Sequence, residues 1–315
     1  MKLFIKSMLP ALCLLLILQV SAQNIFSVVG NKTYLNGHPF QSIGLRCSNA
    51  LLTDSTTKEL IHFLDVYASY GINTITVYFM GSRYSKIHGY RTDGSLNDTY
   101  AARMEKIIKA CDERSMIVLV GVLYWGSGPD VTNYYRNWTQ SEANAAMRHT
   151  VAWLGENNFQ NVFVDPDNEG MAERGLGINI DEMICAAKNE ASEVIVAYNG
   201  KGYPPPCADL SIHFGFPTKS KPYIETEGTP SRYWGDYSKE DDLQHYINVG
   251  IYTDGKKAEQ LARTKELLNM GHGYLLASTW LQNIPPNYHP GGDGSPCNPG
   301  IQWWLDFIRD HFKNQ

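Results

Sequence analysis

The chain has 315 residues, with 27 basic and 32 acidic side chains and a formal net charge of −5. This length suits a single β/α barrel with long loops, since such a barrel typically takes about 250 residues. No block of basic residues occurs, so nucleic acid and anionic membrane surfaces are not expected as partners.

The first 22 residues are predicted to be a secretory signal peptide. Lys2 and Lys6 precede an apolar run over residues 9–20, and Ser21 and Ala22 supply small residues for cleavage before Gln23. The run is shorter than the roughly 18 apolar residues expected of a membrane span. We therefore expect an exported protein, periplasmic or extracellular, with one domain over 23–315 and no membrane segment after the signal is removed.

The cysteines do not form a recognisable framework. Five would remain after removal of the signal peptide, at irregular spacing and without a CxxC pair, so neither a disulfide framework nor a zinc site is predicted. One or two bridges are compatible with export. Cys111 and Cys185 fall in helical patterns and are expected to be small buried hydrophobes.

The mature chain is expected to begin with a β-hairpin, because Gly30-Asn31 and Asn36-Gly37 are turn signals between apolar runs. Apolar strand-like runs then alternate with amphipathic helical patterns. The predicted strands are 41–45, 72–79, 116–125, 161–169, 194–200, 209–216, 222–228 and 273–280. The predicted helices are 56–70, with a capping box of Thr56 and Glu59, 101–114, one that starts with Thr139 and Glu142, 179–190, 258–270, and one from about Gln302.

Eight strands with helices between most of them predict the α/β class and a (β/α)8 TIM barrel. The nearly continuous apolar runs are typical of parallel strands buried on both faces. The links before the sixth and seventh strands are too short for full helices, so the barrel should be irregular and partly helix-less between strands five and seven. An open doubly wound sheet is the alternative, but the first strand lacks a Gly-rich phosphate loop.

Two of the predicted strands end in carboxylates. Asn168-Glu169 ends the fourth strand, and Glu225 and Glu227 end the seventh. Active sites of β/α barrels lie at the carboxyl ends of the strands. Two carboxyls at that end are the minimal equipment for hydrolysis of a glycosidic bond, in which one holds a proton and the other stays ionised.

Strand alternation places Asp165, Asp167 and Glu169 on one face and Asn168 on the other. Because strand ends twist or bulge, both Asn168 and Glu169 are expected to reach the cleft. Asp165 and Asp167 are interpreted as structural, paired with Arg46 or with backbone amides.

These motifs resemble those of the clan A glycoside hydrolases, the retaining β/α-barrel enzymes that include cellulases, mannanases and β-galactosidases. In that clan an Asn-Glu pair ends strand four and a Glu followed by a nearby Gly ends strand seven. Asn168-Glu169 matches the first motif and Thr226-Glu227-Gly228 matches the second. The resemblance implies that Glu169 is the acid/base, that Glu227 is the nucleophile and that Asn168 holds the sugar 2-hydroxyl. Glu225 remains the alternative nucleophile.

Looser matches supply further predicted contacts. The resemblance implies a place for His213 near the nucleophile and for Trp280 as a sugar platform on strand eight. Similar enzymes usually carry an Arg on strand two, where this chain has Thr76, so Arg46 or Arg83 is expected to support the nucleophile. The remaining residues expected to contact substrate are the aromatic side chains Tyr78, Tyr124, Trp125 and Trp234.

The sequence therefore predicts a retaining glycoside hydrolase that cleaves β-glycosidic bonds of an oligo- or polysaccharide by double displacement, without a metal or organic cofactor. Two alternatives stay open. A non-catalytic carbohydrate-binding barrel would fit the absent strand-two Arg and the missing helices. A metal-dependent barrel hydrolase would use His213, Asp165 and Asp167, although such sites usually combine several His at strand ends.

Overall fold

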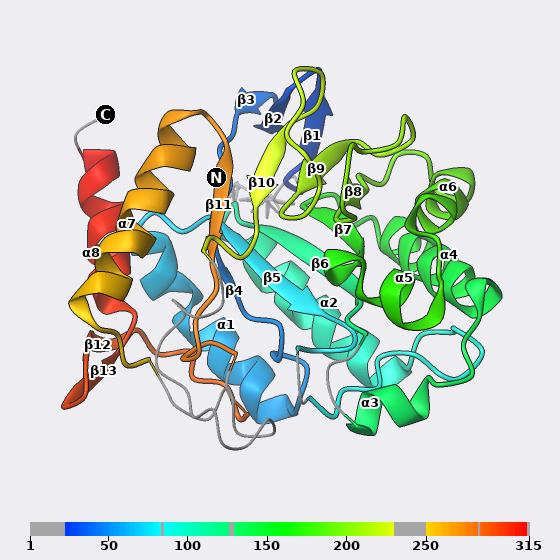
Figure 1. Cartoon of the computed structure of the whole chain (residues 1–315), viewed down its shortest axis with the longest axis horizontal. Helices are drawn as coiled ribbons and strands as arrows, with labels where there is room; N and C mark the ends of the chain where they lie inside the picture. The colour runs from blue at the N-terminus through cyan, green and yellow to red at the C-terminus, as the bar shows by residue number, and fades with distance from the viewer. Residues whose placement is uncertain (1–22, 83–84, 126–128, 230–249, 283, 314–315) are drawn as a thin grey trace, which may run out of the picture.

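The computed structural model describes residues 23–82, 85–125, 129–229, 250–282 and 284–313. The predicted signal peptide, Arg83 and Trp234 lie outside the described residues. Eight parallel strands form the centre of the molecule, in the order β7-β6-β5-β4-β11-β10-β9-β8 (Figure 1). They are β4 (Ile43–Arg46), β5 (Thr74–Tyr78), β6 (Ile117–Leu123), β7 (Val162–Asp167), β8 (Ala197–Tyr198), β9 (Leu210–Ile212), β10 (Tyr223–Glu225) and β11 (Gly273–Leu276).

The two outer strands of this order, β7 and β8, also meet. Val164 and Val196 form a parallel bridge, and the backbone N–H of Val164 donates to the carbonyl of Ile195 at 2.9 Å. The sheet thus curls into a barrel, which confirms the predicted (β/α)8 architecture. Every residue of β4, β5, β6, β7 and β11 is buried, as the near-continuous apolar runs indicated.

Helices surround most of this barrel, with α4 and α6 on one side and α7 and α8 on the other (Figure 1). They are α1 (Asp54–Ser69), α2 (Asp98–Asp112), α3 (Pro129–Tyr134), α4 (Gln140–Glu156), α5 (Met171–Leu176), α6 (Ile180–Glu190), α7 (Asp254–Asn269) and α8 (Gln302–Lys313). The links 199–209 and 213–222, which flank β9, contain no helix. The predicted irregular side of the barrel is therefore confirmed.

The predicted hairpin caps the end of the barrel where the strands begin. It consists of β1 (Phe26–Val29), β2 (Lys32–Leu35) and β3 (His38–Pro39), which pair antiparallel. The N–H of Phe26 donates to the carbonyl of Gln160 just before β7, and its ring lies 5.5 Å from that of Phe163. Functional side chains at the strand carboxyl ends consequently lie at the opposite end of the barrel.

One predicted helix start is wrong and another is confirmed. The capping box of α1 consists of Thr53 and Thr56 rather than Thr56 and Glu59, since the Thr56 hydroxyl accepts from the backbone of Thr53 as a Glu would. For α4, Thr139 and Glu142 form the predicted box. No helix among the described residues is long and apolar enough to cross a membrane.

Short elements were not predicted. Besides α3 and α5, they are a 3₁₀ turn (Asn168–Gly170) and the hairpin of β12 (Gly291–Ser295) and β13 (Asn298–Gly300). The expectation that Cys185 is buried is wrong: it lies on the exposed side of α6, while Cys111 on α2 is buried as expected. A helical pattern identifies the helix, but the face that a small residue occupies depends on what packs there.

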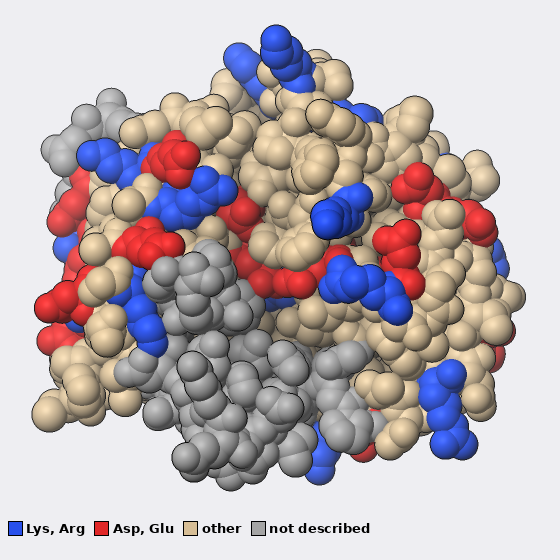
Figure 2. Space-filling model, in the orientation of Figure 1, with Lys and Arg blue, Asp and Glu red and all other residues tan. Residues whose placement is uncertain are grey.

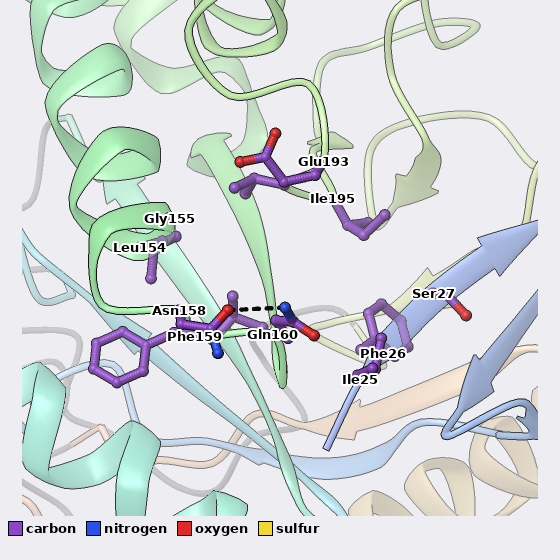
Figure 3. A pocket seen from close by; sticks show the side chains of 12 residues that line it. Ile25, Phe26, Ser27, Leu154, Gly155, Asn158, Phe159, Gln160, Glu193 and Ile195 are labelled. Carbon is purple, nitrogen blue, oxygen red and sulfur yellow. Dashed lines mark hydrogen bonds between the residues drawn. The ribbon is translucent and has the colours of Figure 1, made fainter. Parts of the chain in front are cut away.

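A cavity of about 290 Å³ lies at the hairpin end of the barrel (Figure 3). Ile25 and Phe26 line it on one side, and Leu154 and Phe159 line it near the end of α4. Gln160 donates a hydrogen bond to Asn158 across its floor. Because these residues precede the strands or follow a helix, the cavity is remote from the strand-end carboxylates.

Candidate active site

Three titratable groups come together at the carboxyl ends of β7, β9 and β10. One oxygen of Glu169, one oxygen of Glu227 and one ring nitrogen of His213 all lie within 4.8 Å of one another. The His213 Nε2 is 3.5 Å from Glu169 Oε1 and 3.9 Å from Glu227 Oε2. In the view of Figure 2, acidic side chains gather near the middle of the molecule, with Lys and Arg beside them. The two predicted catalytic carboxyls are therefore neighbours.

Local backbone geometry directs Glu169 toward this group. Strand β7 ends at Asp167, and Glu169 follows in a left-handed conformation (φ 54°, ψ 19°) that a Glu rarely adopts. Asp167 secures the turn, because its Oδ2 accepts from the backbone N–H groups of Ala172 at 2.8 Å and Glu173 at 3.3 Å. His213 also has a positive φ, of 41°. Strained backbone of this kind persists where surrounding contacts enforce it, often at functional sites.

Arg46 links the ends of β7 and β10. Its side chain is fully buried, with Nη1 forming an ion pair with Glu227 Oε1 at 2.7 Å and Nη2 donating to Asn168 Oδ1 at 2.8 Å. Its guanidinium lies 5.3 Å from the ring centre of Tyr78 and 5.5 Å from that of Tyr124. The fork geometry of Arg thereby fixes a carboxylate and an amide at once.

Tyr78 lies behind Asn168 and is completely buried. Its hydroxyl donates to Asp165 Oδ2 and lies 3.2 Å from Asn168 Oδ1, and Asn199 Nδ2 donates to the same Asp165 oxygen at 2.8 Å. Gly121 on β6 leaves room for the ring, since a Cβ there would lie 2.0 Å from it. Tyr78 thus positions Asp165 and Asn168 from inside the barrel.

Glu225 has little capacity left for a substrate. It is 5% exposed and its oxygens already have four partners. These are His213 Nδ1 at 2.6 Å, the Tyr223 hydroxyl at 2.9 Å, and the backbone N–H groups of Glu227 at 3.0 Å and Gly228 at 3.2 Å. A carboxylate so fully occupied is a poor nucleophile, which argues against Glu225 in that role.

Burial and mutual charge shift the pKa values of His213 and of the three glutamates around it. Burial would lower the pKa of His213, yet the carboxylates of Glu225 and Glu227 raise it well above its usual value. Burial acts to raise the pKa of Glu225, but the charged His213 lowers it to about 2. Both groups are therefore charged at neutral pH, and each stabilises the charge of the other.

Glu169 and Glu227 behave as a coupled pair. Burial raises the pKa of Glu227 to about 8; the charge of Arg46 opposes the rise and that of Glu169 adds to it. Burial also acts to raise the pKa of Glu169, but the hydrogen bond and charge of His213 outweigh it and lower that pKa. With Arg46 and His213 positive and Glu225 negative, one proton shared between Glu169 and Glu227 makes the cluster electrically neutral.

The predicted aromatic contacts are less open than a sugar platform would suggest. Tyr124, Trp125 and Trp280 are 3%, 9% and 6% exposed. Tyr124 packs edge-on against Tyr78, and Trp280 Nε1 donates to the carbonyl of His289 at 2.7 Å. These three side chains therefore expose little ring surface on which a sugar could stack.

The residues proposed for a metal site are not brought together. Among the described residues, the one group of three possible metal ligands is Glu169, His213 and Glu227. Asp165 bonds to Tyr78, while Asp167 caps α5. Arg46, 2.7 Å from Glu227, and the charged His213 offset two of the three carboxylates, and a protonated imidazole has no lone pair for a metal, so the group is poorly suited to a divalent metal ion.

Sequence reasoning missed two supporting residues and one contact. Asn199 and Tyr223 hold Asp165 and Glu225, and the pairing of Glu225 with His213 was not foreseen. A signal was present for Tyr223, because residues two apart on a strand share a face. Asn199 follows β8 as Asn168 follows β7, which is the position at which barrel side chains converge.

No family model matches the chain, and no curated protein matches it. Solved structures do. A β-glucanase from Saccharophagus degradans, solved with cellotetraose, is 15% identical with a TM-score of 0.58, over 93% of this chain and 94% of that one. A family 5 glycoside hydrolase from Bacteroides vulgatus is 14% identical (TM-score 0.60, 93% and 72% covered). A family 5 mannosidase from Rhizomucor miehei is 13% identical (TM-score 0.57, 92% and 97% covered). The chain thus has the (β/α)8-barrel fold of solved family 5 glycoside hydrolases.

Proposed function

We propose that the protein is a retaining glycoside hydrolase acting on β-linked oligo- or polysaccharides. The observation that carries this proposal is the pair Glu169 and Glu227, whose oxygens approach within 4.8 Å at the carboxyl ends of two barrel strands. Retaining enzymes hold their two carboxyls about 5–5.5 Å apart, whereas inverting enzymes need about 6.5–9.5 Å to admit a water. The fold shared with family 5 structures supports the same reaction class.

In the proposed reaction, Glu227 attacks the anomeric carbon while Glu169 gives its proton to the leaving oxygen. A glycosyl–Glu227 ester forms as the glycosidic bond breaks, and Glu169, now ionised, takes a proton from the water that hydrolyses the ester. The single proton that the pair holds is the one that this cycle needs. In the substrate-free protein the raised pKa of Glu227 and the lowered pKa of Glu169 place this proton on Glu227. The proposed reaction therefore requires its transfer to Glu169, which the charge of Arg46 at 2.7 Å from Glu227 favours.

Asn168 is suited to hold the sugar. Its Oδ1 is fixed by Arg46, and its Nδ2 donates to the weak acceptor Met171 Sδ at 3.7 Å, a contact that a sugar 2-hydroxyl would replace. Asn168 is buried in the substrate-free protein, so this contact requires the sugar to reach the end of β7. Such a contact strengthens as the ring flattens toward the transition state. The β-glucanase with cellotetraose supports a saccharide as the substrate class here. Export to the periplasm or beyond is part of this proposal and depends on the basic and apolar start of the chain.

The test is hydrolysis of a panel of aryl β-glycosides and β-linked polysaccharides by wild type, Glu169→Ala and Glu227→Ala. We expect both variants to lose activity by several orders of magnitude. Azide should restore Glu227→Ala and yield a glycosyl azide of inverted configuration, whereas it should yield one of retained configuration with Glu169→Ala. Glu173→Ala, at an exposed position on α5, is the matched control and should keep full activity.

Three outcomes would contradict the proposal. A first product of inverted anomeric configuration, read by NMR with wild type, would exclude the retaining mechanism. Binding of a glycan without any cleavage would favour the carbohydrate-binding alternative. Loss of activity on chelation and its return with a divalent cation would instead support a metal-dependent hydrolase.

A further inference from the structure

Cys185 and Cys207 lie next to each other although 22 positions separate them in the chain. Their sulfur atoms are 3.0 Å apart, with Cys185 exposed on α6 and Cys207 half-buried in the helix-less link between β8 and β9. We propose that this pair is an oxidation site and forms a disulfide in the exported protein. This inference stands independently of the proposed catalytic activity.

The surrounding contacts hold the two cysteines in place. Lys188, one turn beyond Cys185 on α6, donates to the carbonyls of Ser192 at 2.7 Å and Val194 at 2.9 Å. The same Nζ forms an ion pair with Asp209 at 3.0 Å, two residues after Cys207. Three prolines, residues 204–206, restrict the backbone just before Cys207.

The remaining movement is small. An S–S bond is about 2.05 Å long, so the sulfurs need to approach by only about 1 Å, which side-chain rotation can supply. The other described cysteines are differently placed: Cys47 and Cys111 are buried, and Cys297 lies on the surface in the β12–β13 hairpin. Cys185 and Cys207 are thus the pair of thiols whose sulfur atoms are in direct contact in the described part of the chain.

The oxidant is a disulfide of a small thiol or of an oxidoreductase. The thiolate of exposed Cys185 attacks it, forms a mixed disulfide and expels one thiolate. Cys207, whose pKa burial and the neighbouring Cys185 raise to about 11, follows as the second thiol. It loses its proton to water and attacks the Cys185 sulfur, which expels the second thiolate. Two protein thiols are oxidised, and one external disulfide is reduced to two thiols.

The bond would reinforce the side of the barrel where helices are missing. It would tie α6 to the link 199–209, which has no helix of its own and begins with Asn199, a partner of Asp165. Closing a loop of this length restricts the unfolded chain, and for a domain of this size we expect the melting temperature to rise by roughly 5 °C.

The test is peptide mapping without reduction, after residues 23–315 have been incubated with oxidised glutathione. Alkylation under denaturing conditions should modify Cys47, Cys111 and Cys297 but not the proposed pair. The fragments containing Cys185 and Cys207 should co-elute, with a mass 2 Da below their sum. Complete alkylation of both cysteines would overturn the proposal, and so would a different pairing.

Melting temperature provides a second measurement. Cys185→Ser and Cys207→Ser should each abolish the effect of reductant, which in wild type should lower the melting temperature by roughly 5 °C. Cys297→Ser is the matched control and should retain that effect. If wild type melts at the same temperature with and without reductant while the map shows no linked fragments, no bond is present.

Discussion

Replacing Glu169 by Gln removes one charge from the coupled pair and preserves the shape of the side chain. The oxygens of Glu169 and Glu227 lie within 4.8 Å. At an effective dielectric constant of about 20, the repulsion between two charges at that distance is about 3.5 kcal/mol. This corresponds to a fall of about 2.5 in pKa, so the pKa of Glu227 should decrease from about 8 to about 5.5.

The assay is kcat/KM against pH, for wild type with an alkyl β-glycoside whose leaving group needs protonation and for the variant with an activated aryl β-glycoside whose leaving group does not. For wild type we expect loss of activity above pH 8, where the pair loses its proton. In Glu169→Gln that alkaline limb should disappear, and an acid limb near about pH 5.5 should report ionisation of Glu227. An alkaline limb that persists in the variant near pH 8 would refute the shared-proton reasoning.

Protein stability gives an independent readout of the same change. Because the folded-state pKa of Glu227 is raised above its ordinary value, wild type loses stability as pH rises toward 8. With its pKa near 5.5, the variant should avoid about 3 kcal/mol of that loss between pH 5.5 and 8. Its melting temperature at pH 8 should then exceed that of wild type by roughly 5 °C, while Glu173→Gln should match wild type.

Three further predictions follow from the site and the fold. Arg46→Lys should lower kcat/KM about 10²- to 10³-fold in steady-state kinetics, because one ammonium cannot hold both Glu227 and Asn168. Activity within threefold of wild type would contradict this. Glu225→Gln removes the principal charge that keeps His213 protonated, so NMR should find the His213 pKa lowered; a His213 that stays charged to the same pH would show that other groups suffice. Thr139→Ala removes the capping box of α4 and should cost about 1 kcal/mol in chemical denaturation with unchanged kcat; no loss of stability would mean that tertiary packing alone fixes this helix end.

The barrel itself could be predicted from the sequence because continuous apolar strands and amphipathic helices leave a strong periodic signal. Helix ends leave a weaker signal in the sequence: the pattern predicts Thr56 as the cap of α1, whereas Thr53 is the cap and the Thr56 hydroxyl completes the box from inside the helix. Chain order could not reveal that Cys185 meets Cys207, since that contact depends on how α6 packs beside the helix-less link.

The location of the candidate site could be predicted from the residues at the strand ends. The orientation of individual side chains there could not. Strand alternation places Asn168 and Glu169 on opposite faces. Both can point to the same site only if the backbone departs from strand geometry near them. The left-handed backbone of Glu169 supplies that departure. The sequence predicts that Tyr78 contacts substrate, but Tyr78 is buried behind Asn168. Its ring packs against Gly121, where any larger residue would collide with it.

The shared proton has a consequence for ligands that imitate the flattened, positively charged sugar. A cation seated between Glu169 and Glu227 would replace the proton there, since both carboxyls could then be charged. Binding should therefore release about one proton to buffer at neutral pH. The affinity of an iminosugar should accordingly rise with pH until about 8, above which no proton remains to be displaced from the pair.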